Sequence, residues 1–253
     1  MKSVRLLAIA NSFSVNCLQY AYGILHDLGV EDIYLGNLYI GGCSLETHCH
    51  NLRGNLPAYT YYTNTDGEWK SAPEHKMVDA IREREWDFVF TQQCSRCSGQ
   101  AETYGDLDEL LAFVKANVQK APVYGWQMTW AYAKDTVHPQ FELYNNSQEE
   151  MYARILNAVQ EKILPRKEIA KIIPSGTAVQ NAREALGDVL NCDGIHLNTL
   201  GCYIAGLCVA KSLVGLEIDG VQYAPEGISE EERKIAIAAA NAACENPFAV
   251  TKI

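Results

Sequence analysis

The chain has 253 residues, of which 48% are hydrophobic, 9% aromatic and 21% charged. This composition is typical of a folded domain with a sizeable core, and it excludes disordered, collagen-like and small disulfide-rich proteins. The formal net charge of −10 repels phosphate backbones and anionic lipids, so we expect neither a nucleic acid nor a membrane as a partner.

No apolar run is long enough for a membrane span, and the stretch from Leu6 to Ala10 is too short for the core of a signal peptide. Nine cysteines, an odd number, fit reduced thiols better than a disulfide framework. We therefore expect a soluble cytoplasmic protein. The sequence leaves open whether a leader peptide has been trimmed from the chain.

The first predicted element is a strand over residues 4–10 that ends at Asn11-Ser12, and apolar residues at helical spacing follow it as far as Gly29. A second strand is predicted over residues 32–40, stopping at Gly41-Gly42. Residues 43–72 look irregular apart from a hairpin signature, in which Asn64-Thr65-Asp66-Gly67 joins two short β-like runs outside the main repeat.

Strands and helices then alternate to the end of the chain. The predicted strands cover residues 86–92, 122–128 and 169–173, and the predicted helices cover residues 74–84, 106–120, 148–164, 178–186 and 199–213. A last hairpin-like piece is expected over residues 217–223. Ser229, followed by three glutamates, predicts the start of a C-terminal helix.

Five strands separated by helices predict a parallel sheet covered on both faces, because parallel neighbours need crossover connections. We expect an α/β fold: a three-layer α/β/α sandwich with a five-stranded parallel, flavodoxin-like sheet. The whole chain, residues 1–253, is predicted to be a single domain with hairpin insertions at about residues 44–73 and 215–228.

Ligands of open parallel sheets bind at the carboxyl ends of the strands, where this sequence places reactive side chains. Ser12 stands where the first strand turns into a helix, whose N-terminus favours a developing anion. His196 can act as its base, and Asp193 can orient the His196 ring. Each residue also has a structural interpretation, Ser12 as a helix cap and Asp193 as a turn residue.

These residues resemble the SGNH or GDSL hydrolases, and more closely an uncharacterised bacterial branch of that superfamily. Residues 7–14 resemble the first sequence block, with Asn11 in place of the commoner aspartate before the nucleophile Ser12. Residues 40–44 resemble the second block, which implies that Gly42 donates its backbone N–H to an oxyanion. Residues 193–197, Asp-Gly-Ile-His-Leu, match the fifth block, Asp-x-x-His-Leu.

The third block departs from the usual Gly-x-Asn-Asp, because this chain has Gln92-Gln93-Cys94-Ser95. It looks more like the Gln-Gly-Glu version of sialic-acid and xylan acetyl esterases. The resemblance then implies that Gln92 or Gln93 donates an amide N–H to the oxyanion. Alternate strand residues face opposite ways, so only one of them is expected to point inward; the alternation does not say which, and Gln92 is preferred.

The implied reaction is hydrolysis of an ester through an acyl-serine intermediate, with no metal and no cofactor. We expect a small-molecule or carbohydrate ester as the substrate, and Asn11 and His48 are assigned to its binding. Aromatic residues suited to stacking on sugar rings favour an acetylated carbohydrate, although such residues also pack insertions onto a domain. They are Tyr59, Tyr61, Tyr62, Trp69, Trp126, Trp130 and Tyr132.

Two other interpretations stay open. A hydrolase fold that has lost its reaction and only binds carbohydrate would also explain the altered third block. Cys94 and Cys97 have the C-x₂-C spacing of a zinc or redox site, but no second pair with zinc-site spacing occurs, so we expect buried free thiols. For His48, the alternative to a role in substrate binding is that of an ordinary surface histidine. The acyl group, the alcohol half of the substrate and the oligomeric state are not indicated by the sequence.

Overall fold

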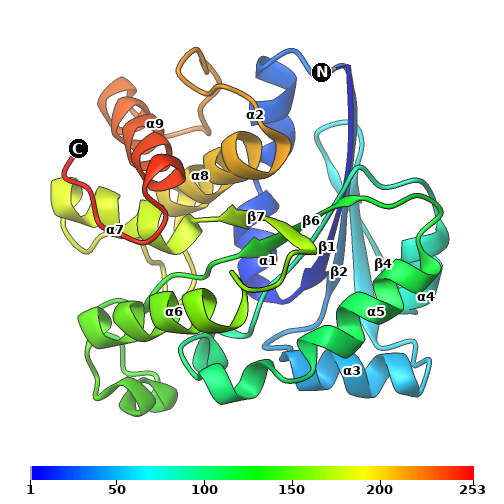
Figure 1. The fold of residues 1–253 in the computed structure, drawn as a ribbon. Helices are drawn as coiled ribbons and strands as arrows, with labels where there is room; N and C mark the ends of the chain where they lie inside the picture. Colours follow the sequence, from blue (N-terminus) through cyan, green and yellow to red (C-terminus); the bar gives the residue numbers. More distant parts are fainter. Residues whose placement is uncertain (1) are drawn as a thin grey trace.

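The computed structural model describes residues 2–253 and builds them around one sheet (Figure 1). Its strands β1 (Ser3–Ala10), β2 (Asp32–Tyr39), β5 (Phe88–Thr91), β6 (Val123–Gln127) and β7 (Ile169–Ile173) lie at the five predicted positions. They run parallel in the spatial order β2-β1-β5-β6-β7. β1, which pairs on both sides, is apolar from Leu6 onward, and its last five residues are buried.

The prediction of a five-stranded parallel sheet is wrong in one respect, because the sheet is mixed and has seven strands. The predicted hairpin is present as β3 (Tyr59–Asn64) and β4 (Trp69–His75), and it extends the sheet, with β3 antiparallel to β2. Its turn follows the sequence signature, with Gly67 at φ +96° and its N–H donated to Asn64 Oδ1. The hairpin covers the hydrogen-bonding edge that β2 would otherwise expose.

Helices cover both faces of the sheet (Figure 1). One layer contains α1 (Ser12–Leu18), α2 (Ala21–Asp27), α8 (Thr199–Cys208) and α9 (Glu230–Glu245), with α7 (Ser175–Leu186) packed against α8 and α9. The other layer contains α3 (Leu45–Arg53), α4 (Met77–Arg82), α5 (Leu107–Asn117) and α6 (Gln148–Lys162). Short 3₁₀ helices span Ser95–Cys97, Ala101–Tyr104 and Pro139–Tyr144, and a π-helical turn spans Val209–Val214.

Two local predictions are wrong. The segment expected to be irregular begins with α3, whose polar sequence lacks a clear apolar stripe but whose first turn is capped by Ser44. The segment over residues 217–223 is no hairpin, since the structure assigns no strand there. Its apolar residues Ile218 and Val221 are instead buried as single side chains of an irregular segment, and Arg233 of α9 donates to the carbonyl of Val221.

Candidate active site

Ser12 stands at the first position of α1, where the chain leaves β1. Asn11 is extended, with φ −134°, and its Oδ1 accepts the N–H of Phe13, which caps the helix. Its Nδ2 donates to the carbonyl of Cys43, 3.0 Å away, and so ties this turn to the loop after β2. Ser12 is half-buried and its side chain stays available to the surface.

The loop before α8 brings His196 and Asp193 to Ser12. The distance from His196 Nε2 to Ser12 Oγ is 2.8 Å, and that from His196 Nδ1 to Asp193 Oδ2 is 2.7 Å. The other carboxylate oxygen of Asp193 accepts the backbone N–H groups of Ile195 and His196. The structure therefore brings the three residues predicted as a triad into one hydrogen-bonded line across 184 positions of sequence.

Electrostatics favour an ionised Asp193. Partial burial by itself raises the pKa of its carboxyl, but the hydrogen bonds from the His196 side chain and from two backbone N–H groups outweigh burial. The net result is a pKa below the ordinary value for aspartate. A carboxylate held this way can fix the orientation of the imidazole and stabilise a positive charge on it.

The site is braced by three side chains, those of Trp130, Phe13 and Asn16, a role that was not predicted for them. Trp130 donates Nε1–H to the carbonyl of Ile195 at 2.8 Å, and its ring stacks on Phe13 with centroids 4.0 Å apart. Asn16, one turn after Ser12 in α1, accepts the N–H of Leu197 through Oδ1. The i, i+4 spacing of Ser12 and Asn16 is the one signal in the sequence that could have indicated this contact.

The loop after β2 presents Gly42 with φ +62°, a conformation that favours glycine. Among residues 2–253 no hydrogen bond uses the N–H of Gly42 or that of Ser12. Arg96, in the loop after β5, donates to the carbonyl of Gly42 at 3.4 Å. Two backbone N–H donors, one at the start of α1 and one in the loop after β2, are thus without an acceptor among the described residues.

The two glutamines after β5 do not have equal roles. Gln93 is fully used, since its Oε1 accepts the N–H groups of Leu45 and Cys94 and its Nε2 donates to Thr103. Gln92 is buried and donates Nε2–H to Asn11 Oδ1 at 2.5 Å, while its Oε1 has no partner among the described residues. Gln93 therefore ties the start of α3 and the 3₁₀ helix Ala101–Tyr104 to the segment after β5, and Gln92 holds the residue that caps α1.

Asn11 and His48 differ from the substrate-binding roles predicted for them. Asn11 is buried, and both ends of its amide bond to protein. His48 is fully buried in α3, where its ring stacks on Tyr59 and its Nδ1 lies 2.9 Å from the Tyr59 hydroxyl. Desolvation lowers the pKa of His48 to about 3, so the ring is neutral and lines no pocket mouth.

Most of the aromatic residues considered as a sugar platform form core instead. Their apolar rings fill the space between the sheet and its helices, as expected for large buried side chains. The buried ones are Tyr59, Tyr61, Trp126, Trp130 and Tyr132, whereas Tyr62 and Trp69 are half-buried and line a cavity.

The described cysteines are all free thiols. Cys94 is buried and Cys97 is half-buried beside it, and a hydrogen bond between the two thiols is the main reason that the pKa of Cys97 is lowered while that of Cys94 is raised. A different group, Cys49 with Asp106 and Glu109, has metal-like spacing. Arg53 already pairs with both carboxylates there, so a cation is supplied by the chain itself.

Comparison with solved structures places the fold beside hydrolases. A putative SGNH hydrolase from Slackia heliotrinireducens matches with a TM-score of 0.54 and 18% identity, over 83% of this chain and 99% of that one. A catalytic mutant of an acetylxylan esterase from Geobacillus stearothermophilus matches with a TM-score of 0.53 and 12% identity, over 88% and 100%. The fold is thus an α/β fold similar to that of SGNH hydrolases.

The particular family is shown by closer similarity. Residues 5–243 match the family model described as a domain of unknown function, DUF4886. The crystal structure of a DUF4886 family protein from Bacteroides uniformis is 37% identical, with a TM-score of 0.95 over 99% of this chain and 98% of that one. This protein belongs to the DUF4886 family. No curated protein matched its sequence.

The structure also bears on membrane insertion. None of the helices within residues 2–253 combines the length and the apolar character that a bilayer crossing needs.

Proposed function

We propose that this protein is a serine esterase that removes an acyl group, preferably acetyl, from a small or carbohydrate substrate. The observation that carries the proposal is the hydrogen-bonded line Ser12–His196–Asp193, with distances of 2.8 and 2.7 Å. A serine needs an adjacent base to act as a nucleophile, and the base needs a third group to orient it. If Ser12 were only a helix cap, or Asp193 only a turn residue, neither would need the other two members of this line.

In the proposed first half-reaction, the proton of Ser12 passes to His196 Nε2 while Oγ attacks the ester carbonyl. The tetrahedral intermediate collapses, the bond from carbon to the alcohol oxygen breaks, and the alcohol leaves with the proton from His196. Water then attacks the acyl-serine, giving its proton to His196, and the acid departs as Ser12 recovers a proton. Asp193 stays ionised throughout and stabilises the imidazolium in both halves.

The oxyanion is assigned to the backbone N–H groups of Ser12 and Gly42, which the described chain leaves without acceptors. Gln92 supports this site by its hydrogen bond to Asn11. The side chain of Asn11 also bonds to Cys43, in the loop after β2, and to Phe13, at the start of α1. Preorganised donors of this kind stabilise charge that develops in the transition state, and loss of one costs about 10²–10³ in rate.

The carbohydrate half of the proposed substrate is supported by one observation of the site. The half-buried aromatic pair Tyr62 and Trp69 lies near α1, which begins with Ser12. The similarity to the acetylxylan esterase, at 12% identity, supports the fold and gives no direct information on substrate.

Hydrolysis of 4-nitrophenyl acetate and labelling by a fluorophosphonate probe test the proposal together. Wild type is expected to turn over the ester and to be labelled, and Ser12→Ala and His196→Ala are expected to lose turnover, with label absent from Ser12→Ala. Ser212→Ala is a matched control, since the Ser212 hydroxyl bonds to the carbonyl of Cys208 in the π-helical turn and contacts no residue of the candidate site. Wild type without turnover or label would favour a binding protein that has kept only the fold.

A further inference from the structure

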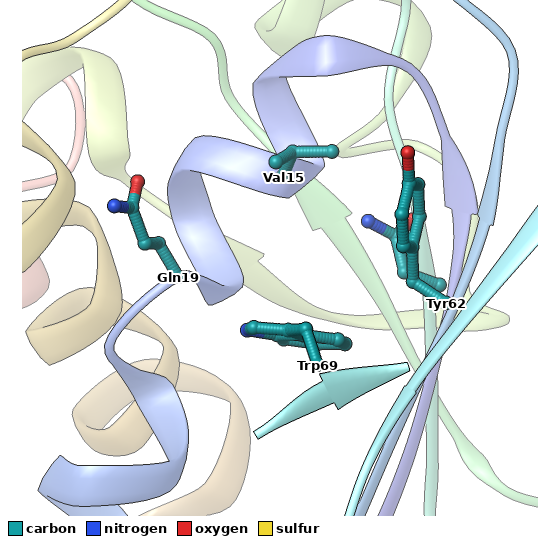
Figure 2. A pocket seen from close by; sticks show the side chains of 5 residues that line it. Val15, Gln19, Tyr62 and Trp69 are labelled. Atoms are coloured by element: carbon teal, nitrogen blue, oxygen red, sulfur yellow. The ribbon is translucent and has the colours of Figure 1, made fainter. Parts of the chain in front are cut away.

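A cavity of about 350 Å³ lies between α1 and the β3–β4 hairpin (Figure 2). Val15 and Gln19 line it from the helix, and Tyr62 and Trp69 reach toward them from the hairpin. Asn37, on β2, completes the lining. Its size is at the lower end of the range typical of small-molecule sites, roughly 300–1,000 Å³.

The strand register explains why these side chains share one face of the sheet. Asn37 pairs directly with Tyr62, and Asn64 pairs directly with Trp69, so the members of each pair point to the same side. Tyr62 and Asn64 are two positions apart on β3 and therefore also face the same way. The hairpin thus carries two aromatic rings past the edge of the helical layer, next to α1.

The cavity adjoins the candidate active site along α1. Ser12, Val15 and Gln19 are spaced at i, i+3 and i+7 and share one face of the helix, about 4.5 and about 10.5 Å along its axis from Ser12. A second connection runs through Tyr39, whose ring packs on Tyr62 with centroids 5.6 Å apart. The hydroxyl of Tyr39 lies beside Gly41, at the start of the loop that presents Gly42.

The lining combines flat apolar surface with amide groups and carries no charge. Asn37 is 1% exposed, and its Oδ1 lies 2.8 Å from the Ser14 hydroxyl, whose one proton also has the carbonyl oxygen of Asn11 as an acceptor at 2.7 Å. Its Nδ2 makes no hydrogen bond within residues 2–253, although the residue borders the cavity. This N–H group is not among the buried unpartnered atoms and is accessible from the cavity, so a ligand oxygen placed there would accept its hydrogen bond.

We infer that this cavity is a subsite for a neutral sugar ring of the substrate, with Trp69 and Tyr62 as the stacking surface. A pyranose has an apolar face of C–H groups that packs on aromatic rings and a rim of hydroxyls that accept and donate hydrogen bonds. Asn37 Nδ2 and the amide of Gln19 meet that rim. The uncharged lining disfavours a phosphorylated or carboxylated ligand, whose charge would be left unpaired.

An acyl chain is the competing occupant, since Val15, Tyr62 and Trp69 would also cover methylene groups. The unpartnered amide of Asn37 argues against it, because a hydrocarbon cannot accept that hydrogen bond. The inference rests on the proposed esterase function in one respect only, namely that the sugar ring belongs to the ester that Ser12 attacks.

Binding is tested first, in the Ser12→Ala protein, so that no turnover interferes. Trp86, Trp126 and Trp130 are buried, so ligand-induced changes in tryptophan fluorescence report mainly on Trp69. Xylobiose and cellobiose are expected to change the fluorescence and to show saturation transfer in NMR. Either substitution of Trp69 removes the fluorescence reporter, so the saturation-transfer signal decides: it should vanish with Trp69→Leu and persist with Trp69→Phe. Absence of binding by both sugars to the parent protein would overturn the inference.

Hydrolysis is tested next, in the chain with Ser12 intact. Trp69→Leu is expected to raise KM for xylose tetraacetate about ten-fold, with kcat retained and with 4-nitrophenyl acetate hydrolysis unchanged within about two-fold. Tyr124→Ala is the matched control, because Tyr124 lines a different hollow beside α5, on the other side of the sheet. An increase in KM for 4-nitrophenyl octanoate in place of the sugar ester would overturn the inference in favour of an acyl site.

The two hypotheses fail in different ways. Sugar binding at Trp69 together with ester hydrolysis that survives Ser12→Ala would refute the proposed function and leave the sugar site standing. Hydrolysis that requires Ser12 but shows no effect of Trp69→Leu on sugar esters would refute the sugar subsite alone.

Discussion

His48 should make the protein less stable as the pH falls, although it lies in no active site. Its ring is fully buried, stacked on Tyr59, and desolvation lowers its pKa from 6.5 to about 3. The unfolded chain therefore binds the proton more tightly than the folded protein does. Stability from this source is complete above pH 6.5 and is lost progressively as the pH falls toward 3.

The size of the effect follows from the two pKa values. Each pH unit below the unfolded value costs about 1.4 kcal/mol, so the free energy of unfolding should fall by about 2.5 kcal/mol between about pH 7.5 and about pH 4.5 on account of His48 alone. That is a large part of the roughly 5–15 kcal/mol by which folded proteins are stable.

The measurement is urea unfolding of wild type, His48→Gln and His50→Gln across that pH range, with tryptophan fluorescence as the signal. Glutamine can keep the hydrogen bond to Tyr59 and does not titrate, so wild type should lose about 2.5 kcal/mol relative to His48→Gln at the acidic end. His50 is exposed on the same helix, and its variant should follow wild type. Parallel curves for wild type and His48→Gln would refute the assignment of a buried neutral ring.

Three further predictions concern other parts of the molecule. Asp193→Asn should lower kcat for 4-nitrophenyl acetate roughly 10³–10⁴-fold with the fold intact by circular dichroism, because the imidazole loses its anionic partner. An unchanged kcat would contradict this. Gly176→Ala should destabilise the protein by about 1–3 kcal/mol in urea, since its Cβ would lie 2.1 Å from the carbonyl oxygen of Thr129. Gly105→Ala, with open space around the Cβ, should show no comparable loss. Cys97, whose pKa is lowered, should be alkylated by iodoacetamide faster than the buried thiols at neutral pH. Peptide mapping by mass spectrometry follows each site, with Cys97→Ser as the control, and a uniformly slow reaction would show that no activated thiol exists.

The parts of the fold that could be predicted are those governed by local pattern. β1 and β5 are short apolar runs, and the Ser229 capping box defines the start of α9 in the sequence as it does in the structure. Whether a hairpin joins a sheet is not a local property. The Asn64–Gly67 turn could be recognised, but its pairing with β2 depended on an open strand edge that no nearby residue specifies.

The candidate site divides in the same way. Ser12, Asp193 and His196 could be predicted because each stands at a strand end or in a short motif, and parallel strands bring their carboxyl ends to one edge. The roles of Gln92 and Gln93 could not, because they depend on which way each amide points and on what Thr103 and Leu45 offer it. The burial of His48 could not be predicted either, because only the packing of α3 decides whether the helix face that carries His48 meets solvent or the core.

The sequence by itself therefore determined the α/β alternation, the strand ends and the three residues of the candidate triad. It did so because hydrophobic periodicity and turn chemistry act over a few neighbouring positions. Only the tertiary structure decided which polar groups are left without partners, such as Asn37 Nδ2 and the N–H of Gly42, and which aromatic rings face a cavity. Those properties depend on burial and on partners far away in the chain, and they are the ones from which a binding site is made.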